Sequence, residues 1–208
     1  MTNSREIATQ IFTEISGKEK FFETVISGNK DFNRLDQRDK AFVKLVVLGT
    51  LRRNGQIQKV IQKLIKTPLK KRNLFILNLI KISICQILFL GIKEYSVVNT
   101  AVEISKKYKL EKFVNGVLRN ICRKKKELNR QIEFESNIPT WISNDVIKNL
   151  GGKYIKKLSD ILIKEPPIDI KIKRNYLAKL DWEKILNGKF VANDVLRVKS
   201  NGPIEKKP

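Results

Sequence analysis

Hydrophobic residues recur every three or four positions through most of the chain, the spacing that places side chains on one face of an α-helix. Ile7 and Ile11 predict a first helix over 4–17. A shorter second helix is predicted over 21–28, and each of the two is closed by a glycine. The pattern therefore begins as a series of amphipathic helices with short connections, which is typical of a helical bundle.

A longer helix is predicted over 36–51. The carboxylate of Asp36 can accept hydrogen bonds from the free amides at its start. Gly55 is expected to end this helix or to bend it sharply. The next helix, over 57–65, should stop before Pro68 because the residue preceding a proline avoids helical geometry.

The most apolar segment covers 71–90 and ends at Gly91. Polar residues interrupt it, so it is predicted to be a buried helix and not a membrane span. Ser96 is predicted to cap the following helix, VVNTAVEISKKYK. A further helix, FVNGVLRNICRKKK over 113–126, joins an apolar stripe to a strongly basic end, so one side should pack and the other should meet anions.

The pattern changes after the basic helix, where a polar, proline-terminated stretch predicts a domain boundary near residue 135. Pro139 should open a helix that ends at Gly151, and another helix is predicted over 154–163. Alternation of apolar and polar residues predicts strands over 168–173 and 195–198. Since two strands cannot bury a sheet face alone, we expect 136–208 to hold linker helices followed by the first strands of an incomplete α/β subdomain.

Basic residues greatly outnumber acidic ones, which indicates a polyanionic partner. The sequence holds 43 Lys and Arg against 21 Asp and Glu with no His, a formal net charge of +22. Each phosphate that Lys or Arg neutralises releases condensed counterions, so nucleic acid is the first candidate and an anionic membrane surface the second. Alternatively, the excess of basic residues reflects a general amino-acid usage rich in Lys, Ile and Asn and not a binding site.

The two cysteines, Cys85 and Cys122, lie in apolar helical patterns without CxxC spacing and are expected to be reduced and buried. The absence of histidine argues against a zinc or haem site and against a histidine-dependent nucleophile. The first ten residues have no apolar core of a signal peptide, so we expect a cytoplasmic protein that is not inserted in a membrane.

Four segments resemble the NusB-type helical RNA-binding domain in their order and spacing. They are RLDQRD at 34–39, GTLRR at 49–53, VVNTAVEISKK at 97–107 and FVNGVLR at 113–119. The resemblance implies an all-helical bundle over 1–135 that binds RNA. It also implies an RNA-contacting role for Arg5 in the first helix.

Two later segments, IPTWISNDVIKNLGG at 138–152 and EPPIDIKIKRN at 165–175, resemble the junction in the ribosomal RNA small-subunit methyltransferase B family, where a NusB-like domain precedes an RNA cytosine-5 methyltransferase. That resemblance implies S-adenosylmethionine as the methyl donor of the catalytic domain. The family's glycine-rich turn and its cysteines in PC and TC contexts do not occur in the 208 residues, and neither Cys85 nor Cys122 matches them. We therefore expect a fragment, an engineered truncation or a split gene that is inactive alone and holds no cofactor.

The candidate RNA-binding residues are Arg5, Arg52, Lys106, Lys107, Lys109, Arg119, Arg123, Lys124, Lys125 and Lys126. The last five can also be a solvated helix end whose cations complement the helix dipole. Arg52 has an equal structural alternative, in which it bonds the carbonyls that end its helix. Asn115 is expected to make a buried hydrogen bond. Trp141 and Trp182 could stack on bases, but each is expected to pack in a core instead.

The function that these features predict is to bind structured 16S ribosomal RNA and position it for cytosine-5 methylation. The expected partners are ribosomal RNA and a methyltransferase domain supplied in trans, with the chain itself a monomer. One alternative is a stand-alone transcription antitermination factor, which the segment at 165–175 argues against. The other is a helical protein-interaction module that uses the apolar face of 113–121.

Overall fold

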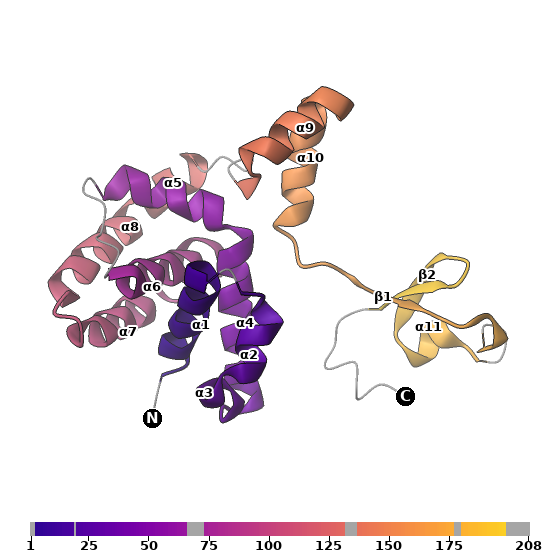
Figure 1. The fold of residues 1–208 in the computed structure, drawn as a ribbon, viewed down its shortest axis with the longest axis horizontal. Helices are drawn as coiled ribbons and strands as arrows, with labels where there is room; N and C mark the ends of the chain where they lie inside the picture. The colour runs from indigo at the N-terminus through magenta and orange to yellow at the C-terminus, as the bar shows by residue number, and fades with distance from the viewer. Residues whose placement is uncertain (1–2, 19, 66–72, 132–136, 177–179, 199–208) are drawn as a thin grey trace. The chain divides into compact units, whose positions relative to one another are not determined.

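The computed structural model describes residues 3–18, 20–65, 73–131, 137–176 and 180–198. Its contacts separate two compact units, Met1–Ile163 and Lys164–Pro208 (Figure 1). The boundary predicted near residue 135 falls among 132–136, outside the described residues, and stays a prediction.

The described residues of the first unit form helices joined by short connections, which confirms the mainly α fold predicted from the hydrophobic spacing. Its helices are α1 (Ser4–Lys18), α2 (Phe22–Gly28), α3 (Lys30–Asn33), α4 (Gln37–Arg52), α5 (Asn54–Leu64), α6 (Leu74–Ile84), the π-helix η2 (Cys85–Phe89), α7 (Glu94–Lys106), α8 (Glu111–Gln131), α9 (Thr140–Leu150) and α10 (Lys153–Leu162).

The core of this unit consists of two apolar clusters that α6 joins. Residues of α1 and α4 form one cluster, which Ile82 of α6 completes. Residues of α5, α7 and α8 form the other around Ile80 and Ile84. Figure 1 shows α6 in the middle of these helices, consistent with the burial of every side chain from Ile82 to Leu88.

The apolar segment 71–90 is two elements where one helix was predicted, as far as its described part shows. An α-helix ends at Ile84 and a π-helix continues to Phe89, a wider turn that hydrophobic spacing does not reveal. The segment then stops at Gly91 as predicted, because its φ of +63° lies in the left-handed region that glycine occupies freely.

Predicted helix starts and ends were correct in some places and wrong in others. Asp36 caps α4 as predicted, accepting a hydrogen bond of 2.7 Å from the amide of Asp39. Gly55 does not end that helix: the break is at Arg53, and Gly55 lies in the first turn of α5. Ser96 is not a cap either, since α7 already begins at Glu94.

The helices α9 and α10 match the two predicted after Pro139, and Gly151 with φ +91° ends the first of them. The prediction for Trp141 was wrong. Its side chain is 73% exposed, although it belongs to an amphipathic pattern.

The second unit contains a three-stranded antiparallel sheet in the order β1-β3-β2. The strands β1 (Ile168–Lys171) and β3 (Val195–Val198) were predicted, whereas β2 (Gly188–Ala192) was not. The 3₁₀ turn η4 (Arg174–Tyr176) and the short helix α11 (Trp182–Ile185) connect β1 to β2.

A small apolar cluster holds this unit together. Ile172, Leu186, Leu196 and Val198 are buried there, and Trp182 packs against them as predicted. Gly188 is required where β2 meets β3, because a Cβ atom at this position would lie 2.6 Å from the backbone oxygen of Arg197. β2 adds a third strand to the sheet, and Trp182 of α11 covers part of its apolar face.

Candidate nucleic-acid interface

The helix α8 presents the largest basic segment of the predicted site. Val114, Leu118 and Ile121 are fully buried against α7 and α6, so the apolar face of α8 lies inside the unit. This contradicts the alternative in which that face is exposed for docking another protein. The sequence of α8 holds seven basic and two acidic residues, and its cations therefore turn toward solvent.

Three of the predicted cations of α8, Arg123, Lys124 and Lys126, are exposed. None of them forms an ion pair with another residue that the structure describes. Arg119 is also exposed and donates a hydrogen bond of 3.0 Å to the side-chain oxygen of Asn115. Asn115 is half-buried. It makes a hydrogen bond as predicted, but at the surface and not in the core.

Lys125 differs from its neighbours because it pairs with the carboxylate of Glu94 at 2.9 Å. This ion pair joins the second half of α8 to the start of α7, and with the short connection between them the two helices run antiparallel. The thiol of Cys122 lies in the same place, and burial followed by the negative charge of Glu94 raises its pKa.

The predicted cations at the end of α7 lie at the opposite end of α8 from Arg123, and do not gather with it. Lys106 pairs with Glu103 at 2.6 Å, and Lys107 pairs with Glu6 of α1 at 2.7 Å. The hydrogen bond to Glu6 raises the pKa of Lys107. Lys109 is exposed at the turn that leads into α8.

Arg5 makes contacts within the unit through its whole guanidinium group. It donates to Gln86 of η2 at 2.7 Å, to Ser96 of α7 at 3.2 Å and to Thr100 at 3.5 Å. Its terminal carbon lies 5.3 Å from the ring centroid of Phe42. Burial lowers its pKa. These partners give Arg5 a structural role, and its contact with RNA stays a prediction.

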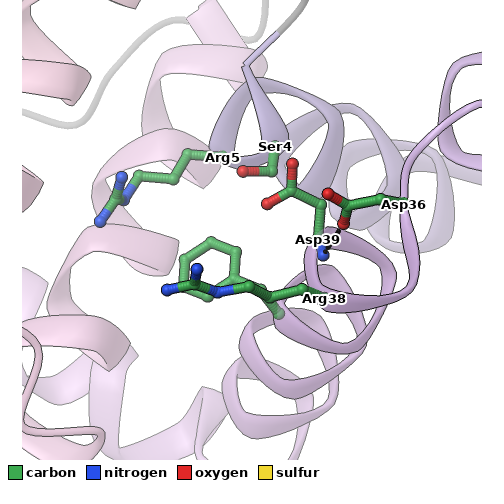
Figure 2. A pocket seen from close by; sticks show the side chains of 6 residues that line it. Ser4, Arg5, Asp36, Arg38 and Asp39 are labelled. Carbon is green, nitrogen blue, oxygen red and sulfur yellow. Dashed lines mark hydrogen bonds between the residues drawn. The ribbon is translucent and has the colours of Figure 1, made fainter.

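Arg5 also lines a cavity of about 360 Å³ beside the start of α4. Figure 2 shows Arg5 and Arg38 on one side of it and the carboxylates of Asp36 and Asp39 beside Ser4 on the other. The cavity therefore mixes both signs of charge. This arrangement does not favour an anion over a cation.

The break between α4 and α5 holds two arginines in different situations. Arg52, the predicted one, is half-buried at the last residue of α4. Arg53 lies with its guanidinium 4.4 Å from the ring centroid of Phe89 and donates to Gln56. Burial lowers the pKa of Arg53. Its contacts with Phe89 and Gln56 make it a packing residue.

Two cations of α8 were not predicted and lie in line with those that were. Lys112 and Arg130 are exposed, and they stand seven residues before Arg119 and seven after Arg123. A seven-residue interval returns to the same helix face, so this spacing could have revealed them.

The NusB family model matches residues 2–123, more than half of the chain. The chain belongs to the NusB family. This confirms the resemblance drawn from the four segments between Arg34 and Arg119.

Curated relatives extend the likeness of this NusB family chain beyond the matched domain. The "Ribosomal RNA small subunit methyltransferase B" of Shewanella oneidensis is 31% identical over 172 residues, 76% of this chain and 39% of the relative. The protein of the same name from Klebsiella pneumoniae subsp. pneumoniae is 24% identical over 194 residues, 89% of this chain and 44% of the relative. The chain thus spans less than half the length of these relatives.

Other kinds of site find little support in the part of this NusB family chain that the structure describes. No helix there is long and apolar enough to cross a membrane, and no three potential metal-ligating side chains gather. Burial raises the pKa of the Cys85 thiol to about 11, so it stays protonated at neutral pH. A protonated thiol is a poor nucleophile.

Proposed function

We propose that this chain binds structured 16S ribosomal RNA and positions it for cytosine-5 methylation by an S-adenosylmethionine-dependent methyltransferase domain. The exposed basic side of α8 carries the proposal, because Arg123, Lys124 and Lys126 form no ion pair with another residue that the structure describes. The family match and the names of the relatives supply the class of substrate.

The binding that this surface supports is electrostatic. Lys and Arg contacts to phosphates fix the register and orientation of a nucleic acid but do not read its bases. The chain would hold the RNA while a target cytosine leaves its helix to reach a catalytic pocket. Little base specificity is expected from these residues alone.

A salt titration tests the binding. The triple variant Arg123→Ala/Lys124→Ala/Lys126→Ala should bind a ribosomal RNA hairpin more weakly than the wild type. Its plot of log K against log salt should flatten by about 0.7 to 0.9 for each lost phosphate contact. The control Lys30→Ala/Lys44→Ala/Lys148→Ala removes the same charge from exposed lysines of α3, α4 and α9. Equal effects of the two variants would assign the basic residues to solubility.

Methyl transfer tests the second half of the proposal. Attack on carbon 6 of cytosine requires a thiolate, and neither cysteine of this chain stands in the family's catalytic contexts. The purified chain should therefore not methylate ribosomal RNA, and adding a separately produced catalytic domain of a relative should give methylation that the triple variant reduces. Methylation by the chain alone would overturn this assignment.

A further inference from the structure

Five cations of α8 lie in one row along the helix, which we call the cationic crest. Its members are Lys112, Arg119, Arg123, Lys126 and Arg130, all exposed. At 100° per residue they fall within an arc of about 60° on the helix surface. They extend over 18 residues, which at 1.5 Å each is about 27 Å of helix.

The crest stands directly opposite the buried face of α8. The buried positions Leu118, Ile121 and Leu128 lie on average about half a turn away around the helix, so packing against α7 and α6 fixes the crest outward. A row of charges held this way has a fixed spacing and a fixed direction. It loses little backbone freedom when it meets a ligand.

Among the described residues, neither acidic residue of α8 forms an ion pair with the crest. Glu127 lies beside it and accepts a hydrogen bond from Gln131 at 3.1 Å. Glu94 of α7 forms its ion pair with Lys125, which lies on α8 but outside the crest. Within the described residues, Lys112, Arg123, Lys126 and Arg130 form no ion pair.

The helix that carries the crest supplies no exposed aromatic side chain on which an unpaired base could stack. From 111 to 131, a range that the structure describes completely, the single aromatic residue is Phe113, which packs against the core. Proteins that hold single strands combine a basic groove with aromatic platforms on which bases stack. The crest offers the charge without the platform.

We propose that the cationic crest binds the phosphate backbone of double-helical RNA. This inference rests on the proposed function and names the form of RNA that the site takes. A duplex holds its phosphates in a rigid array, and proteins recognise A-form RNA mainly through backbone and 2′-hydroxyl contacts across its shallow minor groove. A rigid row of cations matches that array, whereas a flexible strand must be ordered against it.

Gly116 allows the crest to be tested by adding a charge. It lies between Lys112 and Arg119 on α8 and is exposed, with open space where a Cβ would lie. Gly116→Lys would therefore add one cation to the row. It should also favour the helix, since glycine costs about 1 kcal/mol in a helix interior.

The test compares two RNAs, a hairpin and an unpaired strand with the same number of nucleotides. The hairpin stem has about 16 base pairs, the length that double-stranded RNA-binding domains span. The full chain should bind the hairpin at least about tenfold more tightly, because a duplex carries the higher charge density. Arg123→Ala/Lys126→Ala/Arg130→Ala should remove most of that preference, and Gly116→Lys should steepen the salt dependence by about 0.9.

Each other outcome has a definite meaning. Equal binding of hairpin and unpaired strand would overturn the crest inference and leave the proposed function standing. Failure to bind either RNA would overturn both. Equal losses from the crest variant and from Lys30→Ala/Lys44→Ala/Lys148→Ala would overturn the crest, and circular dichroism of each variant separates lost binding from lost folding.

Discussion

Lys125 lies 2.9 Å from Glu94, and this ion pair removes the central lysine of the sequence RKKK from the basic surface. Both side chains are about one third exposed, so solvent weakens the pair. Lys125→Ala should cost about 0 to 1 kcal/mol in the free energy of unfolding, measured by urea denaturation. It should also weaken RNA binding less than Lys126→Ala does. A larger binding loss from Lys125→Ala would place that lysine on the RNA.

Arg5→Ala should destabilise the first unit. The substitution leaves the buried side-chain oxygen of Gln86 without its donor and removes the contact with Phe42, at a cost of about 2 to 3 kcal/mol in unfolding free energy. Arg5→Lys should recover little, because an ammonium group cannot reach the same three acceptors as a planar guanidinium. Urea denaturation measures both variants. Unchanged stability together with weaker RNA binding would instead make Arg5 an RNA contact.

Leu118→Ala tests the packed side of α8. Its side chain is 0% exposed, and truncation should cost about 2 to 5 kcal/mol through lost burial and the cavity left behind. Leu45→Ala serves as the control, since Leu45 is 49% exposed in α4 and should change the unfolding free energy by less than about 1 kcal/mol. Thermal unfolding of the two variants measures the contrast, and similar midpoints would contradict this packing.

Cys85 should make stability fall at high pH. Burial raises its pKa in the folded protein to about 11 from an ordinary value of 9.0. Between about pH 9 and pH 11 the unfolded chain loses this proton and the folded chain keeps it, so the unfolding free energy decreases as pH rises. Cys85→Ala should lose less stability between pH 8 and pH 10 than the wild type does. Identical pH dependence in urea denaturation would show that the thiol ionises equally in both states.

Much of the first unit follows from local sequence. The spacing of apolar residues predicts the helices, and Asp36 predicts a helix start because its carboxylate reaches an amide only three residues away. The π-helix over Cys85–Phe89 breaks that spacing and could not be predicted from it. Trp141 misled for a related reason: an amphipathic pattern shows which residues share a face, but not that something covers the face.

The site shows the same division. Charge clustering along α8 was visible in the sequence, whereas the partners of Arg5 lie 81 to 95 residues away and become apparent only in the folded chain. For Lys125 the partner is 31 residues distant. The sequence therefore identified where positive charge is concentrated. It could not tell which cations already have acceptors inside the protein.

The crest of α8 depends on the angular position of its cations around the helix axis as much as on their charge. A single residue inserted between Arg119 and Arg123 would rotate the following cations by about 100°, and the buried residues after the insertion would rotate with them. Net charge would not change, yet the row would be cut in two. Natural variation in this helix is therefore expected to conserve the number of residues between its cations more strictly than the choice of Lys or Arg at each of them.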